Sequence, residues 1–136
     1  MTRQQKYPDT AWFHFHNENP KGHRTGDCVI RAIARASGNS WDVTLAGLFI
    51  VGYRIKSELA WKDCYEKYLE EQGWNKGKQP RKPDGAKYTV GEWAQLHPNQ
   101  TYIISVANHL TCIIDGKCND IWNCTGKTVL NYWTKA

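Results

Sequence analysis

The first half of the chain carries apolar residues at the spacing of amphipathic helices. Three such stretches predict helices, at residues 28–36, 41–51 and 62–72. Gly38 and Gly73 supply the C-terminal stops of the first and third helices. The pattern from Thr89 to Glu92 is that of a capping box, which predicts a fourth, short helix that Pro98 ends.

The second half changes to short runs of β-branched and aromatic residues, which is the pattern of strands. Strands are expected at residues 102–106, 109–114, 117–122 and 128–133, and an earlier alternation at residues 12–16 hints at one more. Helices followed by an antiparallel sheet predict an α+β fold. A length of 136 residues is that of a single domain. Within this domain, residues 1–18 are candidates for a loosely packed N-terminal extension.

Composition restricts the function classes. Hydrophobic residues make up 40% and charged residues 23% of the chain, as in ordinary soluble domains. No run approaches the roughly 18 apolar residues of a membrane span, so no membrane partner is expected. The N-terminal residues lack the apolar core of a signal peptide, and five cysteines then indicate a cytoplasmic protein with free thiols. The C-terminal cysteines, whose spacing matches no zinc signature, give no reason to expect a metal or cofactor.

The net charge is +5, and much of the excess lies in the basic stretch Lys76–Lys87. Such a stretch can attract an acidic partner, although a solvated loop has the same composition. No nucleic-acid-binding motif surrounds it, so nucleic acid is not an expected partner.

Cys28 stands at the predicted start of a helix, directly after a turn. An unperturbed thiol has a pKa of about 8.5 and is mostly protonated at pH 7. The free N–H groups and the dipole at a helix N-terminus favour the thiolate, and the backbone N–H of Cys28 can also bind a tetrahedral oxyanion. Asp27 is expected to cap this helix. A cysteine that only packs as a small apolar residue at a helix start would have the same sequence context. Whether Cys28 is a nucleophile therefore depends on partner residues elsewhere in the chain.

A nucleophilic cysteine needs a base, and the base needs an orienting group. Among five histidines, His109 alone opens a predicted strand of the C-terminal sheet. The sequence Asp115-Gly116 predicts a two-residue hairpin turn. The register set by that turn places Ile114 opposite Lys117 and His109 opposite Trp122.

Side chains alternate along a strand, so Asp120 shares a sheet face with His109 and is its diagonal neighbour. Asp120 is therefore favoured as the orienting residue. Asn123 falls on the opposite face, and it stays an alternative if the strand ends or bends at Trp122.

The segment Thr25-Gly26-Asp27-Cys28-Val29-Ile30-Arg31-Ala32 resembles the nucleophile segment of papain-like hydrolases. It looks closest to ovarian-tumour-domain deubiquitinases, in which a D-G-N-C-x-x-R-A pattern opens the cysteine helix. Four positions match: Gly26, Cys28, Arg31 and Ala32. Asp27 stands where that family usually has Asn, and Thr25 where it usually has Asp.

The chain from about residue 19 to 133 also resembles small uncharacterised papain-like proteins of phages and Firmicutes. Their N-P-K-G…T-G-D-C-x-x-R-A start and H-L-T…D-G…D-x-W end are present here at residues 19–22, 25–32, 109–111, 115–116 and 120–122. The resemblance implies a papain-like domain, in which N-terminal helices carry the nucleophile and pack on a C-terminal antiparallel sheet. It also implies an upstream amide side chain at the oxyanion hole, for which Asn19 and Asn17 are candidates.

These features predict a cysteine peptidase or isopeptidase that uses Cys28, His109 and Asp120 on a peptide or protein substrate. An amidase or acyltransferase could use the same triad. The third alternative is an inactive papain-like scaffold that binds a partner, for instance a phage protein that inhibits a host system. Alkylation of Cys28 by an active-site-directed reagent separates the enzymes from the scaffold.

Overall fold

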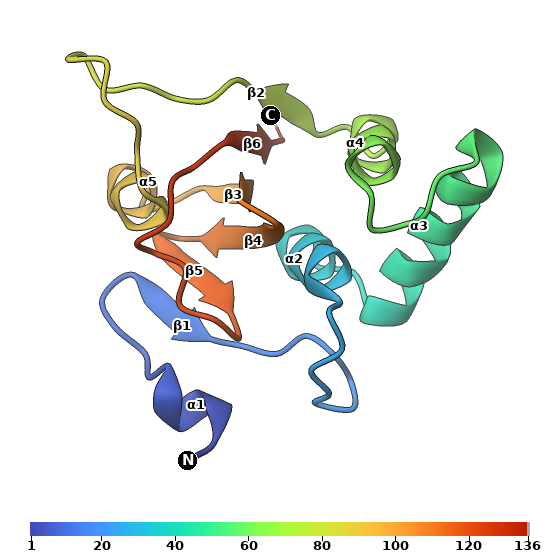
Figure 1. Cartoon of the computed structure of the whole chain (residues 1–136), viewed down its shortest axis with the longest axis horizontal. Coiled ribbons are helices and arrows are strands. Elements are labelled where there is room, and N and C mark those ends of the chain that lie inside the picture. The colour runs from blue at the N-terminus through green and yellow to red at the C-terminus, as the bar shows by residue number, and fades with distance from the viewer. Residues whose placement is uncertain (136) are drawn as a thin grey trace.

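A six-stranded mixed sheet runs through the middle of the molecule, in the strand order β1-β5-β4-β3-β6-β2 (Figure 1). The computed structural model describes residues 1–135. The strands are β1 (Phe13–Phe15), β2 (Asn75–Gly77), β3 (Thr101–Val106), β4 (His109–Ile114), β5 (Lys117–Asp120) and β6 (Asn131–Thr134). With the helices on its two faces, the sheet gives an α+β fold, as the sequence predicts.

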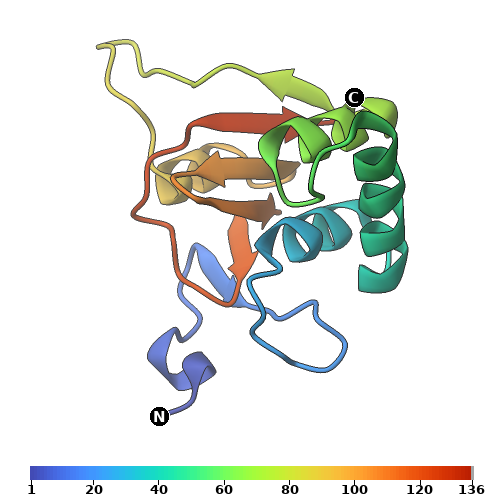
Figure 2. The same cartoon turned by 45° about the vertical axis from the view of Figure 1, so that its right-hand side comes forward.

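Helices cover both faces of this sheet, as the views in Figures 1 and 2 show. Three of them lie together on one face, and α5 lies on the other, while the short α1 sits beside the β1 edge. Their bounds are α1 (Arg3–Lys6), α2 (Cys28–Ser37), α3 (Trp41–Ile55), α4 (Lys62–Glu71) and α5 (Val90–Leu96).

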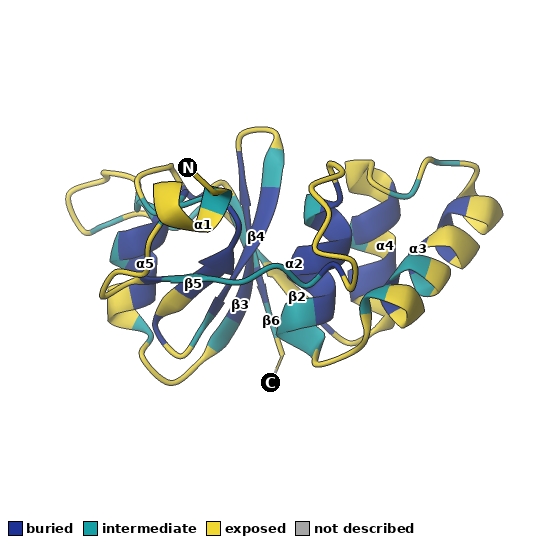
Figure 3. Cartoon of the chain, turned by 90° about the horizontal axis from the view of Figure 1, so that it is seen from below, coloured by how far each residue is buried: buried dark blue, intermediate teal, exposed yellow. Residues whose placement is uncertain are grey.

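The core is divided into two layers because alternate residues of each strand point to opposite faces. Ile103 and Leu110 pack with the buried sides of α2, α3 and α4. Tyr102 and Ile104 pack instead with α5 and with Phe13 of β1. Figure 3 shows the resulting arrangement, with buried residues concentrated along the sheet and on the inner sides of the helices.

The local signals of the sequence fix several elements correctly. Gly38 ends α2 in the left-handed conformation at φ 72°, and Thr89 forms the predicted capping box with Glu92. Asp115 and Gly116 both have positive φ, as the predicted hairpin turn between β4 and β5 requires. The predicted register is confirmed over β4 and β5, where Ile114 pairs with Lys117 and Cys112 with Asn119.

The structure differs from the predictions for the sheet and the N-terminal region at four points. The sheet is not wholly antiparallel, because β1 runs parallel to β5 and pairs Phe13 with Cys118. Phe13 is fully buried, so residues 13–15 are an integral edge of the sheet and not part of a loosely packed extension. The stretch after Trp74, expected to be a loop, contains β2, which pairs with β6. The strand predicted to reach Trp122 ends at Asp120.

The longest helix, α3, has 15 residues and is apolar on both its inner and its outer side. Leu48 and Val51 are buried in the core, whereas Phe49, Ile50 and Tyr53 are exposed. Every helix that the structure describes is too short or too polar to cross a lipid bilayer.

Candidate active site

Cys28 is the first residue of α2 and is half-buried. The backbone N–H groups in the first turn of a helix have no acceptor within the helix. Asp27 occupies the N-cap position, but its side chain makes no capping hydrogen bond, so the expectation that it caps the helix is wrong. The N–H groups around Cys28 therefore remain without that side-chain acceptor.

His109 opens β4, against which α2 packs. Its Nε2 lies 2.6 Å from Oδ2 of Asp120, and the two side chains are 12% and 2% exposed. Because Nε2 is engaged by Asp120, Nδ1 is the ring nitrogen left for the Cys28 thiol, which lines the same two clefts as His109. The structure thus brings together the cysteine, the histidine and the carboxylate, which lie up to 92 positions apart in sequence (120 minus 28).

Trp122 packs edge-on against the His109 ring, with ring centroids 4.9 Å apart and an angle of 80° between the planes. The sequence register placed these two residues opposite each other. The indole covers one side of the His109 ring and so limits the access of water to it.

The environment favours the charged forms of the cysteine and the histidine. Burial opposes the Cys28 thiolate, but hydrogen bonds from His109 and from the backbone of Leu110 outweigh it and lower the pKa of the thiol. Burial likewise opposes the imidazolium, but the contacts with Asp120, Cys124 and Cys28 raise the pKa of His109 to about 11. A lowered cysteine pKa and a raised histidine pKa together favour a thiolate–imidazolium pair.

A buried arginine connects the nucleophile helix to the carboxylate. Arg31 donates from Nε to Oδ1 of Asp27 at 2.7 Å and from Nη1 to Oδ1 of Asp120 at 3.0 Å. The backbone N–H of Ile121 donates to the same oxygen of Asp120 at 2.7 Å. Burial raises the pKa of Asp120, but the contacts with His109 and Arg31 are stronger and lower it overall. Asp120 is therefore held as a carboxylate beside Nε2 of His109.

Asp27 anchors the other end of this network. Its Oδ2 accepts hydrogen bonds from Nδ2 of Asn19 at 3.0 Å and from Nε1 of Trp41 at 2.9 Å. The side-chain oxygen of Asn19 accepts from the backbone N–H of Lys21. The structure therefore places Asn19 in a buried scaffold for Asp27, and not among the residues that line the clefts around Cys28.

The alternative orienting residue and the second amide candidate lie in turns. Oδ1 of Asn123 accepts from the backbone N–H and the hydroxyl of Thr125. Asn17 donates to the carbonyl of His23. Neither asparagine contacts His109 or Cys28 among the hydrogen bonds of residues 1–135, whereas Asp120 contacts His109 directly.

The other four thiols are buried: Cys64, Cys112, Cys118 and Cys124. Cys118 and Cys124 lie 3.8 Å apart, and Cys124, His109 and Asp120 present possible metal ligands within 4.8 Å of one another. However, the Arg31 guanidinium occupies one oxygen of Asp120 and brings a positive charge beside the cluster. This arrangement opposes binding of a second cation.

Two clefts flank the Cys28–His109 pair, and both are also lined by Asn108. The basic cleft, of about 480 Å³, lies toward the N-terminal segment. Its lining residues include Arg3, Lys6, Arg24, Arg31 and Trp122. The second cleft, of about 470 Å³, lies on the side of α4. Its lining residues include Val29, Lys62, Tyr65, Val106 and Leu130. An extended substrate could therefore pass over the thiol from one cleft into the other.

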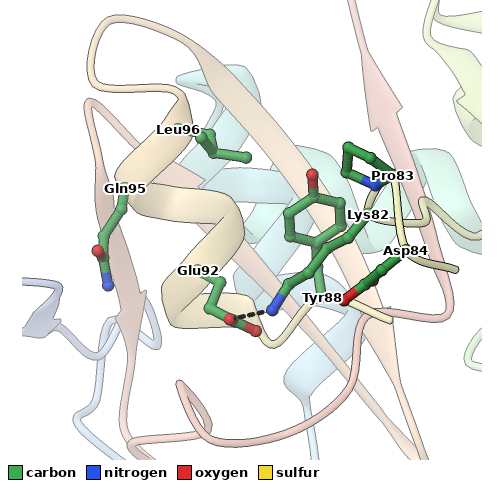
Figure 4. A pocket seen from close by; sticks show the side chains of 7 residues that line it. All are labelled: Lys82, Pro83, Asp84, Tyr88, Glu92, Gln95 and Leu96. Carbon is green, nitrogen blue, oxygen red and sulfur yellow. Dashed lines mark hydrogen bonds and ion pairs between the residues drawn. The ribbon is translucent and has the colours of Figure 1, made fainter. Parts of the chain in front are cut away.

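A separate hollow lies between α5 and the basic stretch Lys76–Lys87 (Figure 4). Lys82 and Glu92 form an ion pair across it, and Lys76 pairs with Glu66 at 2.6 Å. Part of the positive charge of the stretch is thus neutralised within the molecule. None of the seven residues that line the hollow is a cysteine or histidine, so it offers no nucleophile–base pair.

No protein-family model, no curated protein sequence and no solved structure is found to match the chain. The function is therefore inferred from the geometry of the site. The residues that sequence reasoning missed are Arg31, as the bridge between two carboxylates, and Trp41, as a partner of Asp27. The one sequence signal for the bridge is the spacing of Asp27 and Arg31, because residues four apart are neighbours on a helix.

Proposed function

We propose that this protein is a papain-like cysteine hydrolase that acts on peptide or isopeptide bonds through Cys28, His109 and Asp120. The observation that carries the proposal is that the half-buried Cys28 and His109 line the same two clefts, and that Nε2 of His109 lies 2.6 Å from Oδ2 of Asp120. A nucleophile in contact with a base that is itself oriented by a third group is the arrangement of a catalytic triad. A nucleophile on the first turn of a helix, facing a histidine that opens a strand, supports the papain-like assignment.

In the proposed mechanism the Cys28 thiolate attacks the acyl carbon and forms a tetrahedral oxyanion. The backbone N–H of Cys28, at the start of α2, is the proposed first donor to that oxyanion. The imidazolium of His109 then gives its proton to the leaving amine, and the C–N bond breaks to leave a thioester on Cys28. His109 next removes a proton from water, whose oxygen attacks the thioester and releases the acid and the thiol.

The raised pKa of His109 supports its role as the acid of the first step, since it carries its proton at neutral pH. An amidase or acyltransferase would share every step up to the thioester, and would differ only in the acceptor. The accessible Cys28, with its lowered pKa, favours this enzyme chemistry over an inactive scaffold, which has no need of a reactive thiol.

The test is mapping by mass spectrometry after treatment with a limiting amount of iodoacetamide at pH 7, followed by electrophilic peptide and ubiquitin-type probes. We expect Cys28 to be labelled well before the four buried cysteines, and a probe of suitable sequence to label the same residue. Preferential labelling of Cys64 or Cys124, or a Cys28 no faster than an ordinary thiol, contradicts the proposal.

A further inference from the structure

The wall of the basic cleft carries positive charge that is not neutralised within the described chain. Arg3, Lys6 and Arg24 line the cleft together with Cys28 and His109, and no aspartate or glutamate lines it. Within residues 1–135, none of these three cations forms an ion pair with a carboxylate. This contrasts with the basic stretch, where Lys76 and Lys82 are paired.

Two of these cations are held in place by the fold. Arg3 donates from Nε to the carbonyl of Ile121 at 2.5 Å, directly after the carboxylate Asp120. Arg3 and Lys6 also lie over the ring of Tyr7, at 5.1 and 5.4 Å from its centroid. Their charges are therefore positioned beside the cleft and do not extend freely into solvent.

Two of the cations, Arg3 and Arg24, also lie close enough to oppose each other. Burial lowers the pKa of Arg3, and the neighbouring charge of Arg24 lowers it further. Clustered like charges without an internal partner are stabilised by an anion bound between them, and a cleft lined by one sign of charge concentrates ligands of the opposite sign.

We propose that the basic cleft binds a carboxylate of the substrate, so that the scissile acyl group lies next to an acidic residue of a peptide. This inference rests on the proposed function, and adds to it the chemistry of the substrate. The second cleft has a different character: Val29, Val106 and Leu130 line it, and Lys62 is its one residue with a permanent charge. It suits an apolar residue on the other side of the scissile bond.

The experiment compares two small alkylating reagents that differ in charge, and it needs no knowledge of the natural substrate. Iodoacetate is an anion, whereas iodoacetamide is neutral. The Cys28 thiolate attacks the CH2 carbon of either reagent, so that an S–C bond forms and the C–I bond breaks with loss of iodide. The ratio of their rates at Cys28 measures the attraction of the cleft for a carboxylate. The rate with iodoacetamide corrects for changes in the amount or reactivity of the thiolate.

The ratio is measured for the wild-type chain and for the double variant Lys6→Gln/Arg24→Gln. The matched control is Lys78→Gln/Lys87→Gln, which removes the same net charge from exposed positions outside the cleft. We expect the ratio to fall by about five- to tenfold in the cleft variant and to change little in the control. Raising the ionic strength to about 1 M, where the Debye length is about 3 Å, should also lower the wild-type ratio.

A peptide assay then follows from the same logic. Peptides that differ only by Glu or Gln next to the scissile bond should differ in kcat/KM in favour of Glu, and the cleft variant should lose that preference. If iodoacetamide labels Cys28 rapidly but the two double variants lower the ratio equally, or not at all, the carboxylate site is wrong while the proposed hydrolase stands. If Cys28 reacts with iodoacetamide no faster than an ordinary thiol, the proposed function fails, and the substrate inference fails with it.

Discussion

Arg31 bonds Asp120 through Nη1 at 3.0 Å, and this contact ties α2, which begins at Cys28, to the carboxylate that holds His109. The Arg31 side chain is 9% exposed and that of Asp120 is 2% exposed. With Asp27 and His109 on either side, the charges alternate in sign along the network. Each charge is therefore stabilised by its neighbours, and the loss of one leaves others buried without a partner.

Replacement of Arg31 by Leu should destabilise the protein strongly, because it leaves the buried carboxylate of Asp27 without its ion-pair partner and leaves that of Asp120 with His109 alone. We expect a loss of about 3–5 kcal/mol in the free energy of unfolding, measured by urea denaturation at pH 7. Arg54→Leu is the matched control. Its ion pair with Glu71 is largely exposed, with side chains 49% and 33% accessible, and its loss should cost no more than about 1 kcal/mol. Similar losses in the two variants would show that the buried bridge contributes nothing beyond a surface pair.

Asp120→Asn should lower the pKa of His109, since it removes the negative charge that stabilises the imidazolium while keeping an oxygen for Arg31. The thiolate then loses part of its cationic partner. The measurement is the rate of Cys28 alkylation as a function of pH, in which the acidic limb should move to higher pH. Asn123→Ala should leave the profile unchanged, because Asn123 contacts Thr125 and not the histidine. A shift in the Asn123 variant alone would make Asn123 the orienting residue.

Cys28→Ala and His109→Ala should each abolish hydrolysis of a substrate found by the probe experiment. Residues that act as one unit lose activity together, so the double variant should be little worse than either single one. The fold should survive Cys28→Ala because Cys28 is half-buried and small, and it should survive His109→Ala because Asp120 keeps its ion pair with Arg31. Circular dichroism checks the fold, and the comparison of residual rates checks the coupling. Losses that multiply would mean that the two residues act independently.

In the Cys28→Ala protein, which lacks the thiol that loses its proton on folding, stability should fall as the pH rises through the neutral range. The pKa of His109 is raised from about 6.5 in the unfolded chain to about 11 in the folded chain. Its contribution to stability is therefore fully present below about pH 6.5 and is lost as the pH rises toward 11. Between these values the folded state holds one more proton, which gives a slope of at most about 1.4 kcal/mol per pH unit.

Urea denaturation of the Cys28→Ala protein between about pH 6 and pH 9 measures this slope without a contribution from the Cys28 thiol. A second substitution, His109→Gln, should flatten it. The carboxylates give the opposite dependence. The pKa values of Asp27 and Asp120 are lowered, so their contribution is present above about pH 3.9 and is lost on further acidification. A Cys28→Ala protein whose stability is level across neutral pH would contradict the raised histidine pKa.

Local signals in the sequence were enough to predict the parts of the fold that depend on neighbouring residues. The turn residues Asp115 and Gly116 set the register that brings Asp120 to His109, and Gly38 ends α2. The pairing of β1 with β5 could not be predicted, since Phe13–Phe15 is three residues long and its partner lies about 105 positions further along the chain (118 minus 13). Strand β2, with the sequence Asn-Lys-Gly, has no β-branched or aromatic residue to signal it.

The candidate site also contains residues that the sequence alone could predict and residues that it could not. Cys28, His109 and Asp120 could be proposed from a helix start, a strand start and a hairpin register. The function of Arg31 could not, because its bond to Asp120 spans 89 positions and depends on how α2 packs against the sheet. Asp27 shows the limit of a local rule: a residue of the right type at an N-cap position bonds Asn19, Arg31 and Trp41, and does not cap the helix.

The pairing of β1 with β5 places the N-terminal segment beside the basic cleft, although that segment supplies none of the three residues of the proposed triad. No residue of α1 is buried, so Arg3 and Lys6 can be exchanged without repacking the core. Substitutions in the buried Asp27–Arg31–Asp120 bridge, in contrast, leave buried charges without partners. The proposed preference for a carboxylate can therefore be altered by substitutions within the first seven residues that leave the three residues of the proposed triad in place.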